Sequence, residues 1–182
     1  AVRRADIIVM LVDGSSGRLS DQELKLMFYA FEEHKSLLLV FNKSDLVDDD
    51  KEALLSFELE QYQFFLKNIP QIRTSCLSGK NVGIVMREIE KIRKRLTQEI
   101  DCAELTEYLH ERLRKKPLFH KRQRLQVFSI TRRNERGIAF TLCVNQPSWF
   151  GQSQLSYFEN ILRRKYDLRG CPVQFVVVKR GK

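Results

Sequence analysis

The sequence predicts an α/β protein in two parts: a parallel-sheet α/β domain over residues 1–99 and a smaller, basic α+β domain over residues 100–182. Two apolar runs in the first part, separated by a segment with helical spacing, predict parallel strands joined by a crossover helix. The second part has the order α-β-β-α-β, which is typical of a small sandwich. The two parts also differ in net charge. Residues 1–100 carry 15 Lys and Arg against 16 Asp and Glu, whereas residues 101–182 carry 17 Lys and Arg against 7 Asp and Glu.

The first part opens with two strands and the helix between them. Residues 5–13 are a nearly continuous apolar run followed by a Gly- and Ser-containing turn, which predicts a strand that needs neighbours on both sides. Ser20 and Glu23 have the spacing of a capping box, and apolar residues recur at helical spacing over about 21–33. Residues 37–41 predict a second, buried strand. This order predicts a right-handed parallel βαβ unit.

A polar motif, Asn42-Lys43-Ser44-Asp45, follows the second strand. In open α/β sheets ligands bind just beyond the carboxyl ends of the strands, so the motif lies where a ligand is expected. The Asp45 carboxylate can accept two hydrogens from guanine, whereas adenine offers no such pair. Asn42 can bond the purine or tie neighbouring loops together, and the Lys43 stem can lie along base and ribose. The motif therefore indicates guanine recognition; the alternative is an ordinary polar turn.

A second loop is expected at the same edge of the sheet. Three aspartates at 48–50 precede a predicted helix over about 51–68, and a short third strand spans about 69–74. That strand leads into Ser75-Cys76-Leu77, whose backbone N–H groups could donate to the guanine carbonyl oxygen. A turn of this composition is a weak signal by itself. A further helix is expected over about 81–97, with Lys and Arg in its last turns.

The second part is expected to begin with Asp101 as the cap of a helix that reaches about Lys115 and stops before Pro117. Two strands that would pair around a polar loop come next, then a helix and a last strand. These four elements are expected at 125–130, 138–144, 153–166 and 173–178.

The motifs of the first part resemble a known family. Asn42-Lys43-Ser44-Asp45 together with Ser75-Cys76-Leu77 resembles the two guanine-recognition loops of a Ras-like P-loop GTPase domain. Residues 13–17 and 19–23 resemble the preceding stretch of the bacterial GTPases called Der or EngA. That family has two tandem GTPase domains followed by a KH-like domain. The chain is similar, over essentially all of its length, to the C-terminal portion of the second GTPase domain plus the KH-like domain.

Two substitutions depart from the family, since Ser44 stands where tryptophan is frequent and Cys76 where alanine is usual; neither removes a contact that defines guanine. A larger departure is that the sequence contains no Gly-x-x-x-x-Gly-Lys-Ser/Thr phosphate loop and no Asp-x-x-Gly switch before residue 5. We therefore expect no catalytic residue and no metal ligand in this chain, and no GTP hydrolysis by it alone. We also expect further residues upstream of Ala1, whether cleaved off, left out or not resolved, because the first strand otherwise leaves a sheet edge uncovered.

The resemblance implies a parent protein that is a GTPase, binds GTP or GDP, and holds Mg²⁺ through residues upstream of Ala1. It also implies a role in ribosome biogenesis, in large-subunit assembly. The partners implied are a guanine nucleotide, ribosomal RNA or the large ribosomal subunit, and the protein's own GTPase domains. We expect a cytoplasmic monomer.

Positive charge in the second part suggests contact with the phosphate backbone of RNA. Ordinary KH modules clamp nucleotides with a Gly-x-x-Gly loop, which this part lacks, so non-specific binding to structured RNA is the better expectation. The alternative is that the basic surface aids solubility or docks against the GTPase domains. The candidate RNA-binding residues are Lys115, Lys116, Lys121, Arg122, Arg124, Arg132, Arg133, Arg136, Arg163 and Arg164.

Several functions are not expected. No apolar run approaches the roughly 18 residues of a membrane span, and the first residues lack the form of a secretory signal. The four cysteines are scattered and the three histidines form no i, i+4 pair, which argues against a metal site or a disulfide framework. A constitutive RNA-binding or adaptor protein, with the nucleotide-site motif serving only as scaffold, remains the alternative function. The related GTPase Era also carries a KH domain, but the missing Gly-x-x-Gly argues against it.

Overall fold

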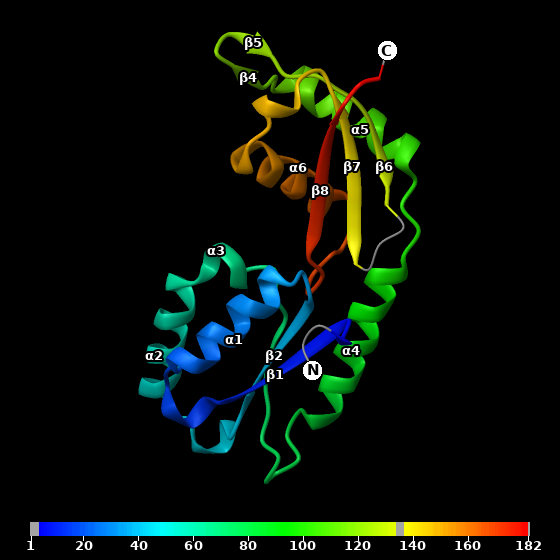
Figure 1. The fold of residues 1–182 in the computed structure, drawn as a ribbon. Helices are drawn as coiled ribbons and strands as arrows, with labels where there is room; N and C mark the ends of the chain where they lie inside the picture. The colour runs from blue at the N-terminus through cyan, green and yellow to red at the C-terminus, as the bar shows by residue number, and fades with distance from the viewer. Residues whose placement is uncertain (1–3, 134–136, 182) are drawn as a thin grey trace. The chain divides into compact units, whose positions relative to one another are not determined.

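The structure is a computed structural model that describes residues 4–133 and 137–181 (Figure 1). The chain divides into two compact units. Unit 1 comprises Ala1–Thr97 together with Leu168–Pro172, and unit 2 comprises Gln98–Asp167 together with Val173–Lys182. The division after Thr97 lies close to the boundary expected between residues 99 and 100. The sequence pattern did not predict that five residues from the second part would cluster with unit 1.

Unit 1 is built on a three-stranded parallel sheet, as the βαβ pattern predicted. The strands lie in the order β1 (Ile7–Asp13), β2 (Ser36–Asn42) and β3 (Gln71–Arg73). Helices cover both faces, with α1, α2 and α3 on one and α4 on the other (Figure 1). Their bounds are α1 Asp21–Glu32, α2 Asp49–Gln61, α3 Gln63–Leu66 and α4 Val82–Thr97.

Local sequence signals explain where these helices begin. The Glu23 N–H donates to Ser20 Oγ at 3.2 Å and the Ser20 N–H donates to Glu23 Oε2 at 2.7 Å, so the predicted capping box of α1 is present. Asp48 caps α2 by accepting from the Lys51 N–H at 2.9 Å. The prediction of a single helix over about 51–68 is wrong, because the helix is interrupted at Tyr62, between α2 and α3. Phe65 and Leu66 are buried beyond that break.

The core of unit 1 lies between the sheet and α1–α3. Met27, Leu39, Phe41 and Leu55 are each no more than 1% exposed. The opposite face of β1 is different, since Leu11 is 61% exposed. β1 is an edge strand of the described sheet, so one side of it has no neighbouring strand there.

The segment 168–172 is bonded into unit 1 beside the start of β2. The Leu37 N–H donates to the Gly170 carbonyl at 3.1 Å, and the Gly170 N–H donates to the Asn68 carbonyl at 2.7 Å. Gly170 has φ +77°, and a Cβ placed there would lie 2.9 Å from Ile92 Cγ1. Leu168 and Cys171 are buried. Five residues that follow the last helix in sequence thus complete the core of the first unit.

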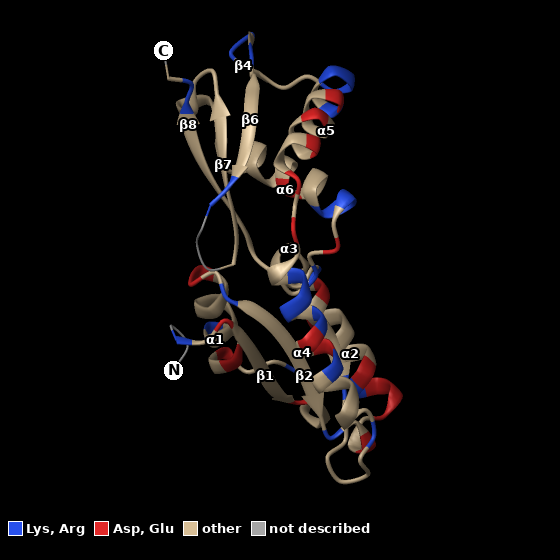
Figure 2. Cartoon of the chain, turned by 90° about the vertical axis from the view of Figure 1, so that its right-hand side faces the viewer, with Lys and Arg blue, Asp and Glu red and all other residues tan. Residues whose placement is uncertain are grey.

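Unit 2 has the predicted α-β-β-α-β order with one addition. Strands β6, β7 and β8 form a sheet in that order, β6–β7 antiparallel and β7–β8 parallel, with α5 and α6 on one face (Figures 1 and 2). The addition is a short hairpin before β6, made of strands β4 and β5 with two residues each. The bounds are α5 Cys102–Lys115, β4 Phe119–His120, β5 Gln123–Arg124, β6 Val127–Arg132, β7 Ile138–Val144, α6 Gln152–Lys165 and β8 Val173–Lys179.

Candidate guanine-recognition site and basic surface

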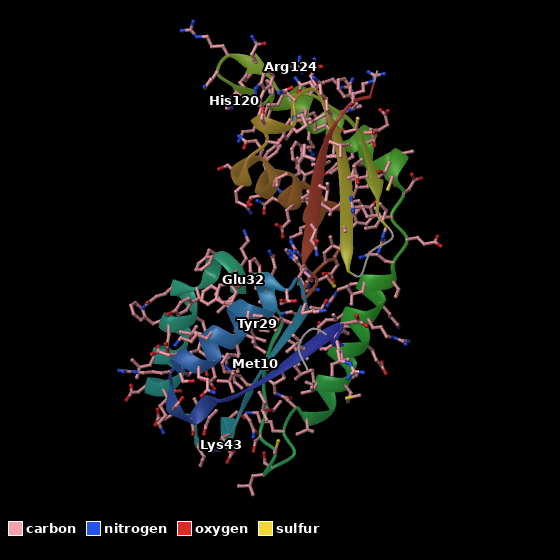
Figure 3. All side chains as sticks on the ribbon, viewed as in Figure 1. Met10, Tyr29, Glu32, Lys43, His120 and Arg124 are labelled. Carbon is pink, nitrogen blue, oxygen red and sulfur yellow. The ribbon has the colours of Figure 1, made fainter. Side chains whose placement is uncertain are left out.

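The Asn42 motif lies at the carboxyl end of β2, as predicted. Asn42 is the last residue of the strand, and Lys43 has φ +62°, which turns the chain into a short 3₁₀ turn over Ser44–Leu46. Lys43 and Asp45 are exposed. Figure 3 shows Lys43 at the loop end of unit 1, away from the body of the sheet. The turn therefore leaves both charged side chains at the surface.

Hydrogen bonds join this loop to the loop that follows β3. Asn42 Oδ1 accepts from the Cys76 N–H at 3.0 Å, and the Ser44 N–H donates to the Thr74 carbonyl at 2.9 Å. Thr74 and Ser75 are buried beneath the two loops. The two segments that the sequence placed at one edge of the sheet are thus in direct contact. Of the two roles considered for Asn42, the structure shows that of tying the loops together.

The second loop has a defined shape of its own. The Ser78 N–H donates to Ser75 Oγ at 3.1 Å, and Gly79 adopts φ +76°, a conformation that suits glycine. Leu77 at the tip is 90% exposed. One expectation must be corrected: the Cys76 N–H, considered as a donor to a guanine carbonyl, is directed to Asn42 Oδ1 because that bond holds the loops together.

A third loop contributes a residue that the sequence reasoning missed. Lys43 Nζ donates to Asp13 Oδ2 at 2.6 Å, and Asp13 Oδ1 accepts from the N–H and the hydroxyl of Ser15 at 3.0 and 2.6 Å. Asp13 is the last residue of β1 and pairs in register with Asn42. The next residue, Gly14, has no room for a side chain, since a Cβ would lie 2.9 Å from the Asn42 carbonyl oxygen. The two predicted parallel strands end at the same edge of the sheet, and this could have indicated the contact between Asp13 and Lys43.

The contacts of Asp13 lead to a prediction on pH. The hydrogen bond from Lys43, followed by that from Ser15, lowers the pKa of Asp13 from 3.8 to about 2. A carboxyl group whose pKa is lower in the folded state stabilises that state above pH 3.8, and this contribution is lost as the pH falls towards 2. The pair is half exposed, so we expect Asp13→Asn to cost less than about 1 kcal/mol at pH 6 and nothing below pH 2.

Urea unfolding of the wild type and the variant between pH 2 and pH 6 measures this difference. Lys43→Met serves as the matched variant, because it removes the partner and should abolish most of the same pH dependence. A stability difference that stays constant over this pH range would contradict the assignment.

The candidate RNA-binding residues do not form one group. Arg132 Nη1 donates to the Gln98 carbonyl at 2.6 Å, and Arg163 Nε donates to Glu159 Oε1 at 2.8 Å, so both are held in bonds within unit 2. Arg133 is half-buried and Arg164 exposed, while Arg136 lies outside the described residues. The exposed cations that adjoin one another in sequence are those at the end of α5 and in the β4–β5 hairpin: Lys115, Lys116, Lys121, Arg122 and Arg124.

Two negative expectations can be compared with the described residues. Residues 4–133 and 137–181 contain no group of three or more His, Cys, Asp or Glu that could hold a metal ion. In the same part of the chain, every helix is too short or too polar to cross a membrane.

The parallel sheet with its joined loops, followed by the mixed sheet of unit 2, defines an α/β protein that ends in a KH-like domain. Residues 99–177 match a family model described as the KH-domain-like region, C-terminal, of EngA bacterial GTPase enzymes. The whole chain is also similar to proteins named GTPase Der. It is 28% identical to that of Desulforamulus reducens over 183 residues and 29% identical to that of Finegoldia magna over 185 residues.

These matches cover 99% and 100% of this chain but 42% of each relative, so the chain spans less than half the length of the relatives it matches. The chain is therefore similar to the C-terminal region of the Der (EngA) GTPases, and residues 99–177 match the model of their KH-like domain. The resemblance predicted from the motifs is thereby confirmed.

Two solved structures of Era are also similar, each at 16% identity over 98% of this chain. Era of Aquifex aeolicus bound to GDP and AlF4⁻ gives a TM-score of 0.41, with 66% of that chain covered. Era in complex with MgGDPNP and a fragment of 16S ribosomal RNA gives 0.39, with 67% covered. Scores this low support no argument about the present chain.

Proposed function

We propose that the chain belongs to a GTP-binding protein of ribosome biogenesis, acting in large-subunit assembly, whose first part recognises guanine and whose second part contacts RNA. The observation that carries the first half is the bond between Asn42 Oδ1 and the Cys76 N–H, which brings two loops together beside the exposed Asp45. Names of the relatives support the GTPase class. The protein is proposed to act as a monomer in the cytoplasm.

Selectivity for guanine follows from the chemistry of Asp45. Its carboxylate can accept from both the ring N–H and the exocyclic amine of guanine in a bidentate pair. A base without these donors would leave the carboxylate desolvated and unpaired, at a cost of about 1–3 kcal/mol or more. The Lys43 stem, whose amine donates to Asp13, can lie along the base and ribose. Recognition therefore depends largely on rejecting the wrong base.

Hydrolysis of GTP is assigned to the parent protein rather than to this chain. Phosphoryl transfer needs backbone N–H groups and a lysine on the phosphates, together with a magnesium ligand. The sequence offers no phosphate loop, and the described residues form no cluster that suits a metal. We therefore assign GTP or GDP phosphates and Mg²⁺ to residues outside this chain, and we expect the chain alone to be inactive.

Asp45→Asn in the full-length parent protein tests guanine recognition. An amide donates where the carboxylate accepted, so the variant should lose its preference for guanine nucleotide and gain one for xanthine nucleotide. The expected loss in GDP affinity is about 10- to 100-fold, measured by calorimetry with GDP and xanthosine diphosphate. Asp49→Asn, on the exposed first turn of α2, is the matched control and should leave both affinities unchanged.

The resemblance implies a first GTPase domain that would still bind GDP, so the affinity is compared at the site that carries Asp45. Retention of guanine preference at that site by Asp45→Asn would exclude the proposed role of this carboxylate. A parent protein that binds no guanine nucleotide at all would instead favour the alternative, a constitutive RNA-binding or adaptor protein whose motif is only scaffold.

A further inference from the structure

The β4–β5 hairpin of unit 2 carries an unusual concentration of positive charge. Residues 112–124 contain seven Lys and Arg and no Asp or Glu. Lys121 and Arg122 at the tip and Arg124 on β5 are all exposed. Figure 2 shows the basic residues of the hairpin and of the end of α5 at the same end of unit 2. A surface of this composition attracts a polyanion.

The two residues at the tip of the hairpin have a strained backbone conformation. Lys121 and Arg122 adopt φ values of +43° and +69°, the left-handed region in which glycine and asparagine are favoured. A residue with a Cβ in this region costs about 1–2 kcal/mol. Strain of this kind is typical of functional positions, and here it places two long cations side by side on a tight turn.

The hairpin is also held in place by its surroundings. Phe119 pairs with Arg124, and His120 pairs with Gln123. At the base, Asn145 Nδ2 donates to the Arg124 carbonyl at 2.9 Å. His120 stacks on Trp149 with ring centroids 5.9 Å apart and an interplanar angle of 12°. Figure 3 shows His120 and Arg124 on this hairpin. The hairpin is therefore tied to Asn145 and Trp149 of unit 2.

Beside the cations, the hairpin carries an exposed aromatic ring, that of Phe119. Neighbouring residues on a strand point to opposite faces, and while His120 stacks on Trp149, Phe119 is 57% exposed. An exposed aromatic ring beside cations is the combination with which proteins bind unpaired nucleotides, because bases stack on the ring while phosphates meet the charges. Paired bases are already stacked on their neighbours, so an unpaired segment is the better ligand.

We propose that the β4–β5 hairpin binds an unpaired segment of RNA, with a base stacked on Phe119 and adjacent phosphates on Lys121 and Arg122. This inference rests on the proposed contact between unit 2 and RNA, and it names the part of the surface and the kind of RNA. In a structured RNA the ligand is a loop or a bulge.

The test uses the full chain and fluorescence anisotropy with a fluorescein-labelled 12-nucleotide oligouridylate and an RNA duplex of the same length. Lys121→Gly combined with Arg122→Gly removes both charges while glycine suits the left-handed turn. Phe119→Leu keeps an apolar side chain and removes the aromatic ring. Arg93→Gln combined with Lys94→Gln, two exposed cations of α4, is the matched control for charge. Circular dichroism checks that each variant is folded.

We expect the double-glycine variant to bind the oligouridylate about tenfold more weakly at 0.1 M salt. The slope of log K against log salt concentration should fall by about 1.4, as expected for two lost phosphate contacts. Phe119→Leu should weaken single-strand binding about fivefold without changing that slope or the duplex affinity. The control variant should bind like the wild type.

If the wild type binds RNA and the hairpin variants bind it as tightly as the control variant does, the hairpin is not the binding site. The RNA contact of unit 2 would then still stand. Duplex binding as tight as single-strand binding, with no effect of Phe119→Leu, would overturn the stacking role. No binding of either RNA by the wild type would refute the RNA half of the proposed function itself.

Discussion

Phe41→Ala is expected to lower the free energy of unfolding of unit 1 by about 3–5 kcal/mol. The ring is 1% exposed within the core cluster, and the guanidinium of Arg73 lies 4.6 Å from its centroid. Removing the ring leaves a cavity in this core, at the residue that precedes Asn42 on β2. Urea unfolding followed by circular dichroism measures the effect.

Phe57→Ala is the matched control for this substitution. Phe57 lies on α2 in the same unit but is 65% exposed, so the same change should cost less than about 1 kcal/mol. Equal losses of stability in the two variants would mean that Phe41 is not the core residue described above.

Gly170→Ala is expected to destabilise unit 1 by about 2–4 kcal/mol, through two separate causes. A Cβ at this position would lie 2.9 and 3.0 Å from the Ile92 side chain and 3.1 Å from Pro70 Cδ. Ile92 is fully buried and cannot move aside without disturbing the core, which is the usual cost of overpacking. The backbone is also at φ +77°, which alanine adopts only with strain.

Gly79→Ala separates these causes. Gly79 has nearly the same φ, +76°, but nothing lies within 4 Å of an added Cβ. This variant should therefore show the backbone strain alone, about 1 kcal/mol, in the same urea titration. A Gly170→Ala variant no less stable than Gly79→Ala would contradict the close packing of residues 168–172 against Ile92.

Much of unit 1 could be predicted from local sequence because the relevant signals are short-range. Ser20 and Glu23 specify the start of α1, and the apolar run 37–41 specifies a buried strand. The convergence of Asn42 and Cys76 could also be predicted, because parallel strands deliver the loops that follow them to one edge of the sheet.

Other features were not predicted from the sequence. The ion pair of Lys43 with Asp13 joins residues 30 positions apart and was missed, although the parallel pairing of β1 with β2 could have indicated it. The β4–β5 hairpin was missed because its strands have two residues each and because Lys121 and Arg122 occupy the turn in place of the usual glycine or asparagine. Sequence also could not show that Arg132 and Arg163 would be held in bonds within their own unit.

The membership of residues 168–172 in unit 1 affects how the protein should be dissected. A truncation after residue 99, the natural choice from sequence, would separate β2 from Gly170 and uncover the Ile92 side chain. If such a fragment bound nucleotide poorly, the cause would be the disrupted packing of unit 1 and not the loss of unit 2. Point substitutions on the intact polypeptide avoid that confusion, and they are the sounder way to assign separate roles to the two units.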